Sequence, residues 1–575
     1  MLSQAVRLEV GTDMAAIVPS VTDQDRTSTT NKATIVLAIL SAAMFIYVID
    51  TTIMNVSISA LVEDLGTTVG EVQTAITLYT LTMAAFMLTG GKLGDIWGSK
   101  RAFRIGLVIY GVGTIITALA PNIGFIILGW SVLEGLGSAL IVPAINTLVR
   151  ANFTGTKRAS AYGTLFGVAA AGAAFGPLIG GWLTANLSWR VAFAGEAIIV
   201  VIVLLTSGLL INAPAVIPKP RLDFVGVALS ATGLGLFVYG ILRTSTFGWS
   251  DPLVISFIFV GLAVVGTFVW WVGRRETAGK PALVHPSIFK HRAISAGLPI
   301  LATQTFAQAG LLFLIPVFAQ SVLGFDAFQT GLTLLPLSIG VLATSTLTPR
   351  LGRKIYPKYI IQAGLVLLFI GGYVLARSLD GASRGTDLAL GLLIGGVAIG
   401  LVVGQLPNLI LSGVDQDEAS EASGLQGTAQ NLGMALGTAV IGTVVLSVAL
   451  TSLGNQVQAS PIIPSDVKEQ IAAVVERPFV SADAGRLAED LADLPAEQKA
   501  ELRQIYDKGT LRGFQGAILA GGIVALFGAL MALRLPRKKL ESDSSVEATV
   551  CEVVRSSPLP GLQLEMDDLA PSTKP

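Results

Sequence analysis

Residues 162–183 read YGTLFGVAAAGAAFGPLIGGWL, an apolar stretch long enough to cross a bilayer as a helix. Glycines at this spacing let a neighbouring helix approach closely in lipid, where small residues favour helix packing. The proline removes one backbone donor and bends or weakens the helix at a fixed depth. A tightly packed membrane helix is predicted, and a merely glycine-rich helix without a further role is the alternative. The pattern residues are Gly163, Gly172, Gly176, Pro177 and Gly180.

The composition of the 575-residue chain indicates a protein whose solvent is lipid. Hydrophobic residues make up 52% of it and charged residues only 13%, whereas soluble proteins carry roughly 25% charged residues. No dense run of lysine and arginine lies beside aromatic residues, so a nucleic-acid partner is not expected. The single cysteine, Cys551, excludes an intramolecular disulfide and a cysteine-based metal site. We expect a membrane protein without a bound metal or cofactor.

Fourteen membrane-spanning helices are predicted from stretches of about 20 mostly apolar residues. Basic residues concentrate in the even-numbered connections, which predicts an inner or plasma membrane protein with both termini in the cytoplasm. One of these connections, 414–421, dissents because it holds four acids and no base. The predicted spans are 33–58, 72–91, 102–121, 123–148, 160–184, 190–212, 222–243, 252–272, 293–322, 328–348, 358–377, 386–413, 421–450 and 512–534.

An internal repeat predicts how these spans are grouped. Gly424, Gly433 and Gly437 in span thirteen repeat the offsets of the first three pattern glycines of span five, with Thr438 in place of the proline. A repeat eight spans apart implies six helices, two inserted helices and six more. The predicted divisions are a disordered N-terminus 1–31, a six-helix bundle 32–212, two linking helices 213–285, a second six-helix bundle 286–535 and a disordered tail 536–575.

An acidic segment, 452–511, interrupts the second bundle on the predicted outer side. A loop of this length with its own helical periodicity is usually a small folded cap rather than a tether. Helical stretches are predicted at 466–475, 485–492 and 496–507.

The turn between spans two and three reads GKLGDIWGSKR at 91–101. Its glycines permit a sharp reversal, and Asp95 can sit at a helix N-terminus, where a negative charge is favoured by about 0.3–1 kcal/mol. Lys100 and Arg101 can meet acidic or phosphate groups at the surface. An ordinary tight loop would explain the bases but not the ordered glycines and aspartate. The residues of this turn motif are Gly91, Gly94, Asp95, Gly98, Lys100 and Arg101.

Three motifs together resemble the major facilitator superfamily. The turn at 91–101 is similar to its cytoplasmic gate signature G-x-L-a-D-r-x-G-r-k, and the glycines of 163–181 are similar to its antiporter motif. Span one ends IDTTIMNV at 49–56 and resembles the L-D-x-T-x-x-N-V signature of the fourteen-helix drug:proton antiporters. The resemblance implies an all-α polytopic fold of two six-helix bundles plus two inserted helices. It also implies substrate binding between the halves and alternating access.

Acids within the predicted spans are the candidate coupling residues. By helical rise Asp50 lies about 16 Å deep, and Glu134 in span four lies at a comparable depth, so both are functional candidates. The resemblance places spans one and four beside the central cavity. Burial and like charge both favour a protonated carboxyl group, so the pair could bind a proton or a cationic substrate in its place. A neutral Asp50 hydrogen-bonded between helices is the alternative.

Two further positions depart from the family pattern. Relatives carry R-x-x-Q-G-x-G in span four, where this chain has Ser131 and Glu134, so the family's arginine mechanism does not carry over. Glu196 stands where relatives usually have asparagine, on a span that is peripheral in this fold, so helix packing and lateral access compete with coupling. Amides in lipid normally face protein or a wet cavity, and some only join helices. The amide candidates are Asn55, Gln304, Gln308, Gln405, Asn408 and Gln430.

The expected function is multidrug-type export of amphipathic or cationic small molecules in exchange for protons, by a monomer. Export of a lipid, siderophore or secreted metabolite is the main alternative, because the arginine is lost and two glutamates are gained. A non-transporting receptor or scaffold that uses 452–511 or the acidic tail is a remote one. An enzyme is not expected, since the sequence has no P-loop and surface solvation explains His285 and His291.

Overall fold

The computed structural model describes residues 23–153, 155–212, 221–380, 384–414, 418–465, 467–469 and 495–537. This part of the chain is helical, and fourteen of its helical segments are long and apolar enough to cross a membrane, which confirms the predicted span count. The first six spans are α1 (Asp23–Val56), α3 (Val69–Trp97), α4 (Ser99–Ala118), the run α5 (Ile123–Ile126), η2 (Ile127–Glu134) and α6 (Gly135–Asn152), then α7 (Gly155–Asn186) and α8 (Trp189–Thr206). The inserted pair is α9 (Phe224–Phe247) and α10 (Pro252–Thr277). The last six are α11 (Arg292–Ser321), α12 (Ala327–Lys354), α13 (Pro357–Ser378), α14 (Ala389–Val403) with α15 (Leu406–Leu411), α16 (Ala419–Ala459) and α19 (Ala496–Met531).

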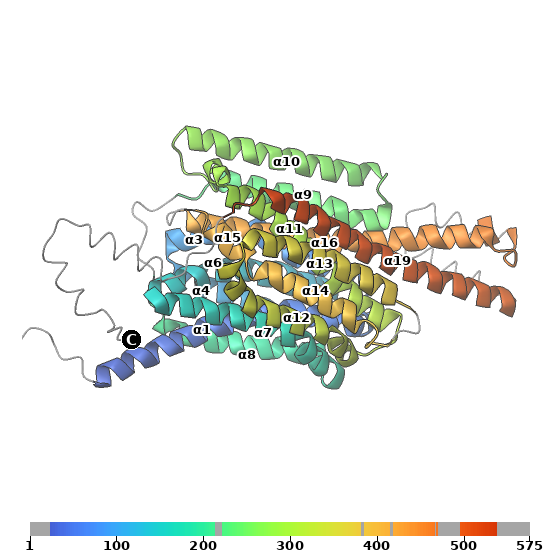
Figure 1. The fold of residues 1–575 in the computed structure, drawn as a ribbon, viewed down its shortest axis with the longest axis horizontal. Coiled ribbons are helices and arrows are strands. Elements are labelled where there is room, and N and C mark those ends of the chain that lie inside the picture. The colour runs from blue at the N-terminus through green and yellow to red at the C-terminus, as the bar shows by residue number, and fades with distance from the viewer. Residues whose placement is uncertain are drawn as a thin grey trace, which may run out of the picture.

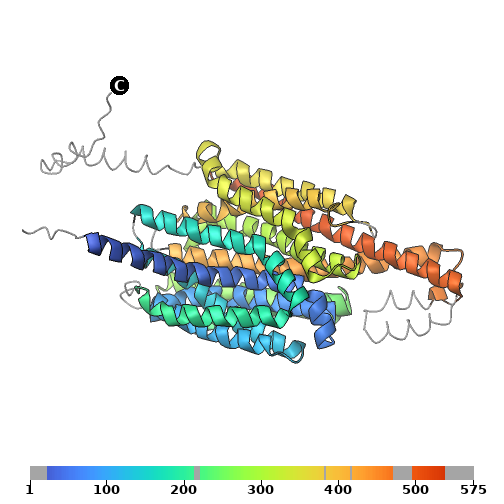
Figure 2. The same ribbon diagram turned by 90° about the horizontal axis from the view of Figure 1, so that it is seen from below.

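The bundle has two distinct ends (Figures 1 and 2). The start of α1 and the finish of α19 lie at one end, which we call the terminal end. At the opposite end, the cap end, α16 and α19 run beyond the other helices as a paired projection. Val457, Ile463, Val467 and Ile505 form a small apolar core in this projection. The cap is therefore held together by its own buried side chains.

Several predicted boundaries differ from the structure at the chain ends and the cap. The expectation of disorder over 1–31 is wrong for residues 23–31, which form the first turns of α1. The predicted cap helix 496–507 is the beginning of α19, so the cap is largely an extension of two spanning helices. The predicted helix 485–492, most of 466–475 and the tail from residue 538 lie outside the described residues.

The repeated glycines produce the same helix packing in both halves. Gly172, Gly176 and Gly180 bring α7 against α1; a Cβ added at Gly180 would lie 2.7 Å from Ile53 Cγ1. Gly433 and Gly437 bring α16 equally close to α11, at Ala302 and Phe306. Span five thus packs on span one as span thirteen packs on span nine. Gly163 is different: no atom lies within 4 Å of an added Cβ, so the close packing predicted for it is wrong.

Two helix pairs, α7 with α12 and α3 with α16, join the halves. At the first, a Cβ added to Gly181 would lie 3.0 Å from the carbonyl carbon of Ala327. At the second, Gln73 Nε2 donates a 2.7 Å hydrogen bond to the carbonyl oxygen of Thr438. The inserted α9 packs over the second junction, where Val238 meets Leu81 of α3 and Ala435 of α16, and α10 lies outside α9 (Figure 1). The inserted pair therefore covers one side of the junction.

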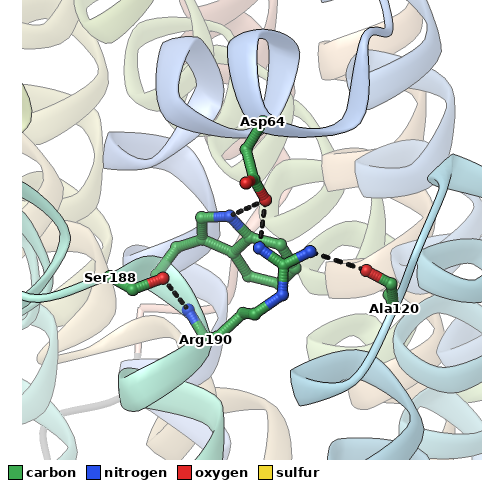
Figure 3. Close-up of polar contacts among 5 residues, drawn as sticks. Asp64, Ala120, Ser188 and Arg190 are labelled. Atoms are coloured by element: carbon green, nitrogen blue, oxygen red, sulfur yellow. Dashed lines mark hydrogen bonds and ion pairs between the residues drawn. The ribbon is translucent and has the colours of Figure 1, made fainter.

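A polar clamp around Arg190 closes the first half at the cap end (Figure 3). Arg190 forms an ion pair with Asp64 of α2 (Ile58–Leu65) and donates a 2.8 Å hydrogen bond to the carbonyl oxygen of Ala120. Its guanidinium lies 4.3 Å from the ring centroid of Trp189, whose indole N–H also donates to Asp64 at 3.1 Å. The α8 helix begins here because Ser188 caps it, accepting from the Arg190 backbone N–H. Three connections of the first half are thereby tied together.

We expect Arg190→Gln to lower the free energy of unfolding by about 1–2 kcal/mol, because a part-exposed ion pair contributes little alone and the stacking and carbonyl contacts add to it. The measurement is the thermal unfolding midpoint of the purified protein, followed by intrinsic fluorescence. Arg243→Gln is the matched control: Arg243 stacks on Phe247 at 4.0 Å but forms no ion pair with a described residue. An equal loss in both variants would contradict the clamp.

Candidate functional site: a buried carboxyl triad

Three acids from three different spans meet inside the first half. Asp50 is on α1, Glu134 is the last residue of η2 and Glu196 is on α8. One carboxylate oxygen of each lies within 4.8 Å of one from each of the others. Asp50 and Glu134 are 0% exposed and Glu196 is 3% exposed. We call this cluster the carboxyl triad.

Each acid of the carboxyl triad has one hydrogen-bonded oxygen and one without a partner. Asp50 Oδ1 accepts from the Trp130 indole N–H at 2.7 Å. Glu134 Oε1 accepts from the Thr117 hydroxyl at 3.0 Å, and Glu196 Oε2 accepts from the Tyr110 hydroxyl at 3.5 Å. The second oxygen of each acid is buried without a hydrogen-bond partner. Three unpaired polar atoms therefore remain in one small volume.

The electrostatics of the triad favour bound protons. No described lysine or arginine forms an ion pair with any of the three acids. Ionising a carboxyl group away from water is costly, and three negative charges at this separation would also repel each other. A shared proton removes a charge and supplies a donor for an unpaired oxygen. The protonated form of the cluster is therefore favoured while its surroundings exclude water.

The π-helical turn η2 positions two members of the site. A π-helical turn within a longer helix often marks a functional site. Here it places Trp130 against Tyr79 with stacked rings 4.5 Å apart, and it points the Trp130 indole at Asp50. Ser131, which replaces the arginine of relatives, donates a 2.8 Å hydrogen bond to the carbonyl oxygen of Ala75. Ser131 therefore joins η2 to α3 and brings no positive charge to the acids.

The structure bears out one expectation about the acids and differs from another. Glu196 lies on a peripheral span, as expected, and its side chain nevertheless reaches the other two acids. Asp50 and Glu134 were expected to face a central cavity, but they are buried and their partners all come from the first half. The physical reason is that α4 and α8 close over them. Sequence reasoning missed the three hydrogen-bond donors because nothing in the spacing relates Tyr110 and Thr117 of α4 to acids on other helices.

The turn motif at 91–101 is arranged differently from the prediction. Asp95 lies in the last turn of α3, not at a helix N-terminus, so the expected dipole stabilisation is wrong. Gly91 and Gly94 continue the helix, and the reversal is made by Gly98 alone, at φ 89°. Lys100 meets a carbonyl rather than an acid or phosphate: its Nζ donates to Gly208 at 2.6 Å. Arg101 is exposed. The motif ties the start of α4 to the end of α8.

Of the candidate amides, only Gln405 forms a hydrogen bond between two helices in the described part of the chain. Asn55 donates to the carbonyl oxygen of Thr51 in its own helix at 2.8 Å, and Gln405 donates to the carbonyl oxygen of Thr348 on α12. Buried Gln304 donates to Gln308 at 2.7 Å and keeps one oxygen without a partner. Asn408 is exposed and Gln430 is half-buried. Gln320, which sequence reasoning missed, joins the halves by accepting from the Ser59 backbone N–H and donating to the carbonyl oxygen of Val56.

The two histidines lie beside acids of the connection 414–421 at the terminal end. His285 Nδ1 lies 2.8 Å from Glu421, and His291 Nε2 lies 3.0 Å from Glu418. Two acids of the dissenting connection thus pair with the two histidines, so surface solvation alone does not explain His285 and His291. These contacts join the linker after α10 to the start of α16.

The carboxyl triad is a poor fit for a hard metal ion. Its three oxygens could ligate a cation, but calcium takes six to eight oxygen ligands and magnesium demands six in near-ideal geometry. The groups nearest the acids include the Trp130 indole N–H, which is a donor and not a ligand. Protons satisfy this donor set better than a metal does.

Residues 40–438 match the model of the Major Facilitator Superfamily. The chain belongs to this superfamily. It is 32% identical to the cephamycin export protein CmcT of Amycolatopsis lactamdurans, over 73% of this chain and 86% of that one. It is 29% identical to the probable actinorhodin transporter of Streptomyces coelicolor, over 74% of both chains. Membership in the superfamily makes the protein a multi-pass membrane transporter and not an enzyme.

A solved structure supports the same fold. A bacterial homologue of the human lysosomal transporter Spinster, in an inward-facing and unoccupied conformation, superposes with a TM-score of 0.57. The match covers 89% of this chain and 99% of that one at 16% identity. At this identity the likeness concerns the fold alone.

Proposed function

We propose that this superfamily member exports amphipathic organic molecules in exchange for protons, with the carboxyl triad as its proton site and no bound cofactor. The observation that carries the proposal is the meeting of Asp50, Glu134 and Glu196 in a buried volume, each with an unpaired oxygen. Buried acids without a compensating base exchange protons with water whenever a conformational change opens their surroundings. Such a site can couple a proton gradient to alternating access.

A contiguous set of contacts links the triad to the junction between the halves. Asp50 is two residues from Thr52, whose side chain lies against Gly176 of α7. The next residue of α7, Pro177, has its carbonyl against Gly331 of α12 in the second half. Loss of the proton would introduce repulsion beside α1, and a shift of α1 would press on the closely packed α7. The proton state of Asp50 is thereby connected to the contact that must separate for the cap end to open.

The cargo class is inferred from the relatives. Relatives are named as transporters of actinorhodin and cephamycin, which are organic small molecules. The same names support the narrower alternative of a dedicated exporter of one secreted metabolite. A multidrug exporter would accept many unrelated lipophilic cations, whereas a dedicated exporter would accept one chemical family.

We infer the placement in the cell from charge. Lys92 near the finish of α3, Arg101 near the start of α4 and Lys157 near the start of α7 lie at the terminal end, which the positive-inside rule places in the cytoplasm. Both termini are then cytoplasmic, the cap projects outward from the plasma membrane, and transport runs from the terminal end to the cap end. A monomer contains the whole carboxyl triad.

The experiment that tests the function uses the full chain in proteoliposomes with an imposed pH gradient. Transport of a fluorescent lipophilic cation, stimulated at least severalfold by the gradient and abolished by a protonophore, is the expected result. Gradient-driven transport of a polyketide or β-lactam but of no unrelated cation would favour the dedicated exporter. Transport that ignores the gradient would refute proton exchange.

A further inference from the structure

A basic pocket opens at the terminal end of the second half, away from the carboxyl triad. It has a volume of about 680 Å³ and lies where α11 and α13 begin and where η6 (Ala532–Arg534) follows α19. Its polar lining comes from Arg292, Ser295, Lys358, Arg534 and Arg537. No acidic residue lines it, and none of these bases forms an ion pair with a described residue. The pocket concentrates positive charge that nothing in the described chain neutralises.

Lys358 shows that the pocket is built into the fold. Its side chain is 7% exposed, and its Nζ donates a 2.6 Å hydrogen bond to the carbonyl oxygen of Leu533, close to the end of the α19–η6 run. An ammonium group has three donors, so two remain for a ligand. A buried ammonium group without an anionic partner is costly unless a ligand supplies the charge.

Two helix N-termini add to the positive potential. Arg292 is the first residue of α11 and Lys358 the second of α13, and neither helix has a side chain capping its first turn. Free backbone N–H groups and the helix dipole make such ends favourable for phosphate. The pocket therefore combines four cationic side chains with two uncapped helix starts.

Apolar surface continues from the pocket along the outside of the bundle. Ile523, Phe527 and Leu530 of α19, together with Leu533 of η6, are each about 60% exposed and recur at helical spacing. On the neighbouring α13, exposed Tyr359, Val366, Ile370 and Tyr373 follow the same pattern. Tyrosine near a helix end is typical of the membrane interface. A molecule with a phosphate in the pocket could lay hydrocarbon chains along these two helices.

We propose that this pocket binds the phosphodiester headgroup of an anionic phospholipid such as phosphatidylglycerol, with its acyl chains on α13 and α19. Basic pockets between helices at the cytoplasmic surface suit such headgroups. A zwitterionic lipid fits less well, because its choline would add a cation to four others.

The test counts phosphatidylglycerol molecules retained by the full-length protein in native mass spectrometry after release from mixed phosphatidylcholine and phosphatidylglycerol nanodiscs. Arg292→Gln combined with Arg534→Gln is expected to weaken retention of one lipid about tenfold or more. The control, Arg104→Gln with Lys157→Gln, removes two exposed bases from the same end outside the pocket and should leave lipid retention unchanged. Unchanged retention in the pocket variant overturns the proposal.

Two further experiments distinguish the lipid from other occupants of the pocket, and the second uses the unmodified protein so that a folding defect cannot affect it. Inorganic phosphate at millimolar concentration should not displace the lipid; full displacement would assign the pocket to free phosphate and overturn the lipid. Phosphatidylglycerol carrying a photoreactive acyl chain should label α13 and α19 of the unmodified protein. Labelling of other helices by the lipid would refute the proposal. Cross-linking of the acidic residues beyond 540 to the pocket would assign the pocket to the tail and also refute the proposal.

Discussion

Gradient-driven export is expected to fall on the order of 100-fold when Glu134 is replaced by glutamine, as is typical when a proton-transferring group is removed. Glutamine keeps the size of the side chain and can still accept the 3.0 Å hydrogen bond from Thr117. It cannot take up or release a proton. The variant therefore resembles a permanently neutral Glu134. The measurement is cargo flux in proteoliposomes with and without an imposed pH gradient.

A loss of coupling can be distinguished from a loss of folding in the same vesicles. Exchange of labelled for unlabelled cargo, which needs no net proton movement, should persist in Glu134→Gln. Glu63→Gln is the matched control because Glu63 is exposed on α2 and does not belong to the carboxyl triad. Wild-type gradient stimulation in Glu134→Gln, and equally in Asp50→Asn, would exclude the carboxyl triad as the proton site.

Substitution of Gly181 by valine is expected to disrupt the junction between the two halves. An added Cβ would lie 3.0 Å from the carbonyl carbon of Ala327 and 3.1 Å from Cα of Phe328, and both are backbone atoms of α12. Backbone cannot rotate away, so α7 and α12 must separate. Overpacking of this kind costs about 1–3 kcal/mol, and here the cost falls on the junction between the halves. We expect a lower thermal midpoint and loss of most export.

Gly163→Val provides the control on the same helix. Nothing lies within 4 Å of a Cβ at Gly163, so the same substitution meets open space. Its thermal midpoint and transport rate should match the wild type. If Gly181→Val were equally harmless, the contact between α7 and α12 would not constrain the halves. If Gly163→Val were equally harmful, the loss would reflect the helix and not the junction.

Much of the architecture follows from local sequence. Fourteen apolar stretches specify fourteen spans, because in lipid a helix is the simplest way for a segment to satisfy its own backbone groups. The repeat of Gly172 and Gly176 at Gly433 and Gly437 indicates two related halves, and both pairs sit at close helix contacts. The same pattern gave a wrong prediction at Gly163. Spacing shows that one face of a helix carries small residues, but it does not show whether another helix packs against that face.

The sequence alone determined the class of the protein, its span count and the presence of acids where lipid should exclude them. Only the tertiary structure decided that Glu196 joins Asp50 and Glu134. It also decided which side chains donate a hydrogen bond to one oxygen of each acid, namely Trp130, Thr117 and Tyr110. Ser131 donates instead to the carbonyl oxygen of Ala75. The tertiary structure also decided that Arg292, Lys358 and Arg534 share one pocket. One physical reason explains why the sequence alone could not show these groupings. Hydropathy and helical period act along the chain within one helix, whereas a site between helices depends on their rotation and crossing, which packing against distant segments sets.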